Sequence, residues 1–273
     1  MTEHLTTLVL GGTGKTGRRV ARRLTTLGVP TRIGSRAGTP AFDWTDRDTW
    51  APALRGVGAL YLAYQPDLAA PGAVATVGDL ARLAVAHGVR RLVLLSGRGE
   101  PEAAEAERAV AASGLDPTVL RASWFAQNFS EGHLVQPLRA GVLALPVGDV
   151  PEPFVDADDI AEAAVAALTS DRHAGATYEL TGPRLLTFAQ AVDEIAAAAG
   201  RPVRFVPVTS AAYAAELSAA GVPAPEVALL TYLFTEVLDG RNARLADGVQ
   251  RVLGRPPRDF RAYAAEAAGA WRP

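Results

Sequence analysis

Short apolar runs alternate with amphipathic segments along the first half of the chain, a pattern typical of strands that alternate with helices. The predicted strands cover residues 5–10, 29–35, 41–44, 59–64, 89–96 and 118–122. The predicted helices cover residues 16–27, 49–54, 71–87 and 101–113. The strands are apolar on both faces, which indicates a parallel sheet buried between two layers of helices. We therefore predict an α/β fold with a doubly wound parallel sheet.

The second half of the chain alternates less regularly. Strands are predicted at residues 142–146, 176–181 and 203–207. Helices are predicted up to residue 168 and at residues 188–199, 210–220, 225–238, 245–253 and 260–271. No repeat or low-complexity linker divides the chain, so we predict one domain over residues 1–273. Within it, residues 1–130 are mainly a dinucleotide-binding core and residues 131–273 mainly a small α/β substrate lobe, with some segments returning to the core.

A glycine-rich turn follows the first strand and opens the first helix. Gly11, Gly14 and Gly17 are spaced three apart, which suits the tight turn, phosphate approach and helix packing of a Rossmann dinucleotide site. The helix N-terminus would hold the pyrophosphate. A P-loop fits less well because it needs a longer spacing between its glycines, and an ordinary βα turn is the alternative. The predicted cofactor residues here are Gly11, Thr13, Gly14, Lys15, Thr16 and Gly17.

The second strand ends in Ser35 and Arg36, where an NAD site usually has an acidic residue. No acid is present, and Arg36 with Ser35 and nearby Arg32 would suit a 2′-phosphate. We therefore favour NADP (NADPH) over NAD as the cofactor. The alternative is that Arg36 is a solvated loop residue.

Later strand ends supply further cofactor candidates. Asp43 and Trp44 could hydrogen-bond and stack on adenine, although Trp44 could equally pack on the sheet edge. Ala63 is small enough to let the ribose approach, and it is followed by Tyr64. The strand at residues 89–96 ends in Ser96. We include these five residues in the predicted cofactor site.

The predicted helix at residues 101–113 lacks the Tyr-x-x-x-Lys pair that short-chain dehydrogenases place there. It contains no Tyr and no Lys, and Lys15 is the only lysine in the chain. The proton transfer which that pair provides is therefore excluded. Glu102, Glu105 and Glu107 remain as acids, although most are expected to be solvated helix surface.

An aromatic and amide cluster follows the strand at residues 118–122, where a nicotinamide should lie. Trp124 and Phe125 could shape a flat apolar pocket, and Asn128 could hydrogen-bond the substrate. The alternative is core aromatics and a helix cap. No catalytic residue is assigned, and the substrate-pocket candidates are Tyr64, Trp124, Phe125, Asn128, His133 and Tyr232. For His133 the alternative is a surface loop residue.

Composition narrows the chemistry. The chain has no cysteine, and its four histidines are scattered: His4, His87, His133 and His173. Disulfides, thiol nucleophiles and a metal site are therefore not expected, and helix capping explains Asp156, Asp158 and Asp159 better than a metal does. A formal charge of −2 without a basic stripe argues against nucleic acid.

The chain also shows no long apolar run and no room for a signal peptide before the first strand. We expect a cytoplasmic protein that acts on a small-molecule substrate, with no membrane partner, as a monomer or homodimer. Its Ala, Gly and Arg usage suggests a bacterial host.

Twelve short motifs carry a family resemblance. They are GGTGKTG at 11–17, GSR at 34–36, FDW at 42–44, LVLLS at 92–96, SGL at 113–115, LR at 120–121, WF at 124–125, NF at 128–129, PFVDADDIA at 153–161, LTGP at 180–183, LT at 186–187 and GRPPRDF at 254–260. In this order they resemble the NmrA-like group of atypical short-chain dehydrogenases. Within that group they look most like the agroclavine and festuclavine dehydrogenases of ergot alkaloid formation.

The resemblance implies an NADP-linked reductase that gives hydride to an iminium carbon, an activated alkene or a quinone. An iminium carbon already carries positive charge, so the missing Tyr-Lys pair is no obstacle, and water or Tyr64 could supply a proton to the other acceptors. Some relatives carry a His or Lys on the helix where Ala103 and Ala104 stand in this chain. This departure puts ketone reduction by the usual route in doubt, and an ergot substrate is not carried over.

Two other functions are compatible with these residues. Other NmrA-like proteins bind a dinucleotide without known turnover and regulate a partner, so a redox sensor is the main alternative. An isomerase or dehydratase on the same fold is the third hypothesis.

Overall fold

The computed structural model describes residues 6–272, so His4 and the first residue of the predicted strand 5–10 lie outside the described part. The chain forms two compact units. The first comprises residues 6–122, 157–180 and 247–255, and the second comprises residues 123–156, 181–246 and 256–272.

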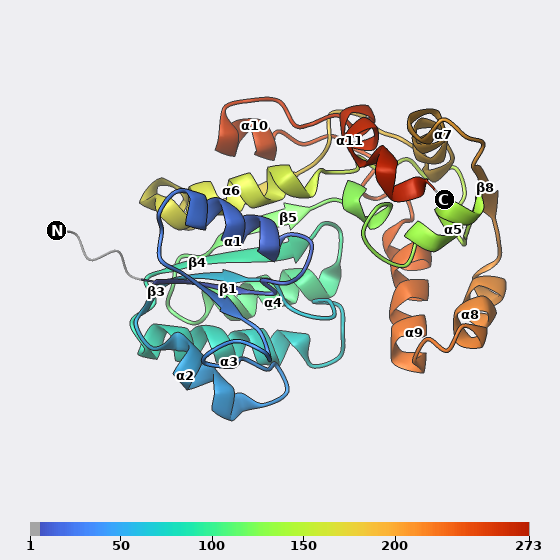
Figure 1. Ribbon diagram of the computed structural model, residues 1–273. Helices are drawn as coiled ribbons and strands as arrows, with labels where there is room; N and C mark the ends of the chain where they lie inside the picture. The colour runs from blue at the N-terminus through green and yellow to red at the C-terminus, as the bar shows by residue number, and fades with distance from the viewer. Residues whose placement is uncertain (1–5, 273) are drawn as a thin grey trace. The chain divides into compact units, whose positions relative to one another are not determined.

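The first unit contains a sheet of six parallel strands in the order β2-β1-β3-β4-β5-β7 (Figure 1). The strands are β1 (Thr6–Leu10), β2 (Thr31–Gly34), β3 (Val57–Leu62), β4 (Arg91–Gly97), β5 (Thr118–Ala122) and β7 (Thr177–Leu180). All six residues of β3 are buried, as expected for a central strand covered on both faces. The predicted α/β fold with a doubly wound parallel sheet is confirmed.

Helices cover both faces of this sheet (Figure 1). On one face lie α1 (Gly17–Thr26) and α6 (Ala157–Thr169), and α10 (Gly248–Leu253) packs against α6 and β7. On the other face lie α2 (Trp50–Leu54), α3 (Ala73–Ala86) and α4 (Pro101–Ala111), with α3 packed against α4. The single turns η1 (Arg47–Thr49) and η3 (Asp171–His173) complete the unit. Leu, Val and Ala side chains make up most of its interior.

The predicted strand at residues 41–44 is wrong. Only an isolated bridge joins Asp43 to Asp46 there. The Asp43 amide donates to Thr49 Oγ1 at 3.0 Å, and its carbonyl accepts from Trp50 Nε1 at 2.8 Å. Because side chains occupy the backbone groups of Asp43, they are not available for a strand ladder.

The second unit holds a separate parallel pair of strands, β6 (Val142–Leu145) and β8 (Arg204–Pro207). Its helical segments are η2 (Ala126–Asn128), α5 (Val135–Ala140), α7 (Phe188–Ala199), α8 (Ser210–Ala219), α9 (Ala224–Tyr232), the π-helix η4 (Leu233–Val237), α11 (Phe260–Ala267) and η5 (Ala268–Trp271). The sequence did not predict α5. The predicted helix at residues 225–238 consists of α9 followed by η4, and the one at 260–271 of α11 followed by η5.

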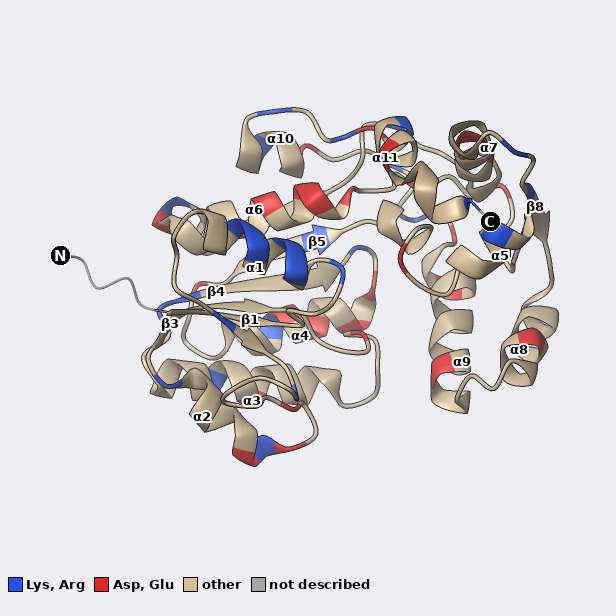
Figure 2. Cartoon of the chain, in the orientation of Figure 1, with Lys and Arg blue, Asp and Glu red and all other residues tan. Residues whose placement is uncertain are grey.

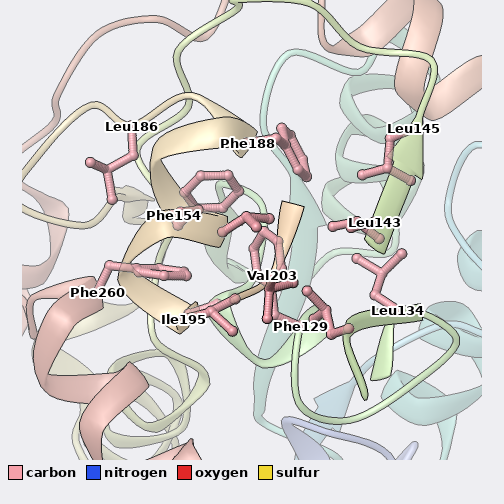
Figure 3. Close-up of a cluster of buried hydrophobic side chains, with 14 of the residues drawn as sticks. Phe129, Leu134, Leu143, Leu145, Phe154, Leu186, Phe188, Ile195, Val203 and Phe260 are labelled. Carbon is pink, nitrogen blue, oxygen red and sulfur yellow. The ribbon is translucent and has the colours of Figure 1, made fainter. Parts of the chain in front are cut away.

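Phenylalanine rings dominate the interior of the second unit (Figure 3). The rings of Phe154 and Phe188 lie 5.1 Å apart edge to face, and Phe129 contacts both at 5.3 and 5.7 Å. Phe260 closes the group at 5.5 Å from both Phe129 and Phe154. Edge-to-face pairs of this kind add to the free energy gained by burying the rings. Residues 6–272 include no helix with the length and hydropathy that a membrane crossing requires.

Candidate functional site

The glycine loop between β1 and α1 makes a tight turn. Gly11 adopts φ +66°, a backbone conformation that suits glycine. The Gly14 amide donates to the Gly11 carbonyl at 2.8 Å, and the Arg18 amide donates to the Gly14 carbonyl at 3.2 Å. Thr13 and Gly14 are exposed at the tip of the loop. Their backbone is therefore accessible to a ligand in front of the first turn of α1.

Gly17 and Gly11 each lie so close to a neighbouring segment that a side chain would not fit easily. A Cβ on Gly17 would lie 2.2 Å from the Gly11 carbonyl oxygen, so only glycine lets α1 begin so close to β1. A Cβ on Gly11 would lie 3.2 Å from Ala63, the residue that follows β3. β1 and β3 are neighbours that lie on either side of the point where the strand order reverses. Such a switch point is where open α/β sheets bind ligands, so the loop fits the pyrophosphate of a dinucleotide.

Thr16 has a structural contact in this loop. Its Oγ1 accepts a hydrogen bond at 3.0 Å from the buried hydroxyl of Tyr61, whose pKa is raised by burial. Lys15 is partly buried, and its carbonyl accepts from the Arg19 guanidinium at 2.8 Å. The loop is therefore anchored to β3 and to the first turns of α1.

The arginines of α1 also account for one of the predicted capping aspartates. Asp158 at the start of α6 pairs with Arg19 at 3.0 Å and with Arg23 at 2.8 Å, two of the arginines on α1 in Figure 2. Asp159 pairs with Arg255 at 2.7 Å. In the described part of the chain no group of three or more His, Asp or Glu side chains has an arrangement that could hold a metal ion.

At the end of β2, Arg36 is exposed and makes no hydrogen bond or ion pair within the described residues. Arg32 differs, because its guanidinium donates to the carbonyls of Ala53 at 2.6 Å and Arg55 at 2.9 Å. Arg36 is therefore accessible to a ligand. Arg32 instead holds the end of α2 and the following Arg55 against β2.

The aromatic residues after β2 pack on one another. The Trp44 ring lies 4.8 Å from that of Tyr64 and 4.9 Å from that of Phe42. The Asp43 carboxylate accepts from the Thr45 amide and hydroxyl, and these hydrogen bonds lower its pKa. Trp44 thus packs at the sheet edge, which was one of the two roles weighed for it, and its contact with adenine stays a prediction.

Ser96 and Glu107 form a polar network with Arg121 at the end of β4. The Ser96 hydroxyl donates to Glu107 Oε1 at 2.6 Å, and Arg121 donates to both carboxylate oxygens at 2.6–3.1 Å. Ser96 and Glu107 are buried. Among the three acids of α4, Glu107 is therefore held in an ion pair, whereas Glu105 lies 3.9 Å from Arg108 on an exposed face.

Asp67 and Glu100 form a carboxyl pair that was not among the residues predicted from the sequence. Glu100 follows β4, Asp67 lies downstream of β3, and their side chains hydrogen-bond one another. Burial, followed by the nearby Asp67, raises the pKa of Glu100 to about 8. A Cβ on Gly97 would lie 2.0 Å from the Glu100 carboxyl. Gly97 is the last residue of β4, and its lack of a side chain leaves room for the Glu100 carboxyl. A glycine at this position is the feature of the sequence that is consistent with such a contact.

The remaining substrate candidates belong to the second unit, whereas Tyr64 belongs to the first. Trp124, Phe125, Asn128 and Tyr232 are partly buried, and His133 is exposed. Trp124 packs against Phe188 and Phe234 at 6.0 and 4.9 Å. That the candidates form one substrate pocket stays a prediction.

A parallel sheet with a glycine loop at its switch point, and no Tyr-x-x-x-Lys pair on the helix after β4, defines an atypical short-chain dehydrogenase/reductase. The chain belongs to the NmrA-like family of these proteins and is an oxidoreductase. No family model matches the chain.

Three relatives align over nearly the whole chain. It is 33% identical to the uncharacterized oxidoreductase YesF of Bacillus subtilis, over 97% of this chain and 96% of that protein. It is 34% identical to a (4-alkanoyl-5-oxo-2,5-dihydrofuran-3-yl)methyl phosphate reductase of Streptomyces griseus, over 97% and 99% of the two chains. It is 31% identical to festuclavine dehydrogenase easG of Aspergillus fumigatus, over 98% and 99%.

A solved structure supports the fold. The NADPH-dependent quinone oxidoreductase QOR2 of Escherichia coli, in complex with NADPH, superposes with a TM-score of 0.79 at 21% identity. The match covers 96% of this chain and 99% of that one. The overall arrangement of strands and helices is therefore shared with that protein.

Proposed function

We propose that this chain is an NADPH-dependent reductase that transfers hydride to an iminium, an activated alkene or a quinone-type small molecule. The observation that carries the proposal is the glycine loop at the β1–β3 switch point, where Gly17 and Gly11 allow close backbone approach. When bound there, the dinucleotide supplies the hydride. The amides at the start of α1 would hold its pyrophosphate.

Arg36 supports the choice of the phosphorylated cofactor. Its guanidinium is exposed at the end of β2 and has no ion-pair partner within the described residues, and Ser35 beside it offers a hydroxyl. No acidic residue stands at this strand end to bind the ribose hydroxyls of NAD. A guanidinium binds a phosphate through two parallel hydrogen bonds, so Arg36 is the proposed 2′-phosphate ligand.

The absence of the Tyr-Lys pair limits the class of acceptor. Helix α4 runs from Pro101 to Ala111 without a Tyr or Lys, and Lys15 lies in the glycine loop. An acceptor carbon that is already electrophilic needs orientation more than it needs an acid. The names of the relatives include a clavine dehydrogenase and a quinone oxidoreductase, which is consistent with such acceptors. Tyr64 or water is the proposed proton source where one is needed.

The test follows NADPH oxidation by the purified chain with cyclic iminium salts, enals, enones and quinones in excess over the protein. We expect turnover with at least one of these acceptor classes. NADPH binding in the micromolar range without turnover on any of them would contradict the proposal and favour a redox sensor. Arg36→Asp, described below, checks the cofactor assignment independently of the acceptor.

A further inference from the structure

Three side chains of the second unit meet around Phe234. The ring of Trp124 lies 4.9 Å from that of Phe234, and the ring of Tyr213 lies 5.5 Å from it. They come from three separate segments: the stretch after β5, helix α8 and the π-helix η4. We call these three residues the Phe234 cluster.

Two hydrogen-bonding atoms of the Phe234 cluster have no partner. The Trp124 Nε1 and the Tyr213 hydroxyl are both buried, and neither has a hydrogen-bond partner within residues 6–272. Tyr213 is only 4% exposed. Buried polar groups are nearly always paired, because leaving one unpaired is costly. Two such groups on neighbours of one ring point to a partner outside the chain.

Both groups can donate a hydrogen bond. An indole nitrogen can only donate a hydrogen bond. Burial raises the pKa of Tyr213 to about 12, so its hydroxyl keeps its proton at neutral pH. An acceptor atom of a ligand could therefore pair with either group, and the hydroxyl could in addition accept a hydrogen bond.

The backbone around Trp124 fixes the position of its ring. The Trp124 amide donates to Glu152 Oε1 at 3.2 Å, and its carbonyl accepts from the Val155 amide at 3.0 Å. The Ala126 amide then donates to the Val155 carbonyl at 2.9 Å. These bonds fix the backbone of Trp124, and its ring packs against Phe188 and Phe234. A side chain that is already positioned lowers the entropic cost of binding.

The elements that carry the other two residues are irregular or weakly packed. Phe234 lies in a π-helix, closed by the Leu238 amide donating to the Leu233 carbonyl at 3.2 Å, and such turns occur often at functional sites. Helix α8 buries only Tyr213, and α9 buries only Val227. Few buried side chains of their own therefore hold these two helices in place.

We infer that Trp124 Nε1 and the Tyr213 hydroxyl are ligand donors, and that the Phe234 cluster binds a planar, uncharged compound through a carbonyl oxygen. The aromatic rings offer a flat apolar surface for such a compound. A cationic iminium compound without an acceptor atom would leave both donors unpaired. That the bound compound is the substrate rests on the proposed function.

The experiment measures binding calorimetrically, without nucleotide, to 1,4-naphthoquinone and to naphthalene, which has the same rings but no carbonyl. The absence of cysteine prevents thiol adducts with the quinone. We expect wild type to prefer the quinone. Tyr213→Phe should weaken quinone binding about fivefold to tenfold, the loss expected for one hydrogen bond, and leave naphthalene binding unchanged.

Tyr263→Phe is the matched control, since Tyr263 is equally buried but packs on Phe260 and Trp271 instead of Phe234. It should leave both affinities unchanged. Tyr213→Phe should unfold at the same or a higher temperature than wild type, because it removes an unpaired buried hydroxyl, and Trp124→Phe should also reduce the quinone preference. Equal quinone affinity in wild type and Tyr213→Phe, or no quinone preference in wild type, would overturn the assignment.

Measuring NADPH oxidation as well as quinone binding distinguishes a failure of this site from a failure of the proposed function. If Tyr213→Phe weakens quinone binding but wild type oxidises no NADPH with any acceptor, the site stands and the reductase proposal fails. If wild type reduces quinones and Tyr213→Phe keeps the same KM, the reductase proposal stands and the Phe234 cluster is not its substrate site. N-methyl-3,4-dihydroisoquinolinium, a cation without an acceptor oxygen, should bind both proteins equally.

Discussion

The two units of this chain build their interiors from different side chains. The first surrounds a six-stranded parallel sheet with Leu, Val and Ala, whereas the second packs Phe rings around a two-stranded sheet. In the first unit the sheet brings strand ends together, so that backbone groups of the glycine loop form the predicted ligand site. In the second, the rings of the Phe234 cluster offer flat surfaces beside Trp124 Nε1 and the Tyr213 hydroxyl, which have no hydrogen-bond partner within residues 6–272. The contrast supports the two proposals, that backbone geometry recognises the cofactor and that aromatic side chains recognise the substrate.

The strongest test of this division removes a ring from the second unit. Phe188 is fully buried and contacts Phe129, Phe154 and Trp124. We expect Phe188→Ala to lower the free energy of unfolding by about 3–5 kcal/mol in urea denaturation, because a large cavity replaces the ring. Leu185→Ala, at a 37% exposed position nearby in sequence, should change it by less than about 1 kcal/mol. Equal losses of unfolding free energy in the two variants would contradict a stabilising role of the aromatic core.

The second test blocks the glycine loop of the first unit. A Cβ on Gly14 would meet only the Gly11 carbonyl, at 3.2 Å, so the fold should accept Gly14→Val, whose side chain would occupy the phosphate approach. We expect NADPH affinity to fall at least about 100-fold, or about 2.7 kcal/mol, with little change in melting temperature. Gly148→Ala, where a Cβ would meet nothing within 4 Å, is the control. Undiminished binding in the loop variant would remove the loop from the cofactor site.

The third test concerns the cofactor preference. Arg36→Asp places a carboxylate where a 2′-phosphate is proposed to bind, so NADPH affinity should fall about 10-fold to 100-fold while NADH affinity falls much less. Fluorescence titration with both nucleotides measures the ratio. Arg90→Asp, an exposed change just before β4 and away from the glycine loop, controls for the general effect of charge. Equal losses for the two nucleotides would contradict phosphate recognition by Arg36.

The smallest expected effect comes from Glu100. Its raised pKa means that the folded chain keeps the proton between about pH 4.5 and about pH 8, whereas the unfolded chain loses it. Stability therefore falls as pH rises through this window. Glu100→Gln should remove that slope and stabilise the chain by about 1–2 kcal/mol at pH 8.5, measured by thermal unfolding across pH. Glu105→Gln, on the exposed face of α4, should keep the wild-type slope.

Local patterns in the sequence predicted most of the regular elements. β5 spans Thr118–Ala122 and α7 spans Phe188–Ala199, with the predicted bounds. Thr187 caps α7, with the Gln190 amide donating to its hydroxyl at 3.1 Å. These features depend on neighbours within a few residues, which is why the sequence alone suffices.

Contacts between distant segments were not predictable in the same way. The segment at residues 41–44 has the composition of a strand, but side chains from η1 and α2 occupy its backbone. Arg32 and Arg36 look alike in sequence, and only the fold shows that Arg32 is already bonded to the carbonyls of Ala53, near the end of α2, and Arg55, just after it.

The sequence by itself determined the alternation of strands and helices, the glycine loop and the absence of a Tyr-Lys pair, because each follows from residues close together in the chain. The tertiary structure decided which polar groups meet after burial. It pairs Asp67 with Glu100 and Ser96 with Glu107. It leaves Trp124 Nε1 and the Tyr213 hydroxyl without a hydrogen-bond partner in the described chain. The physical reason is that the environment of a buried polar group is set by which segments pack together, and local sequence carries little record of that pairing.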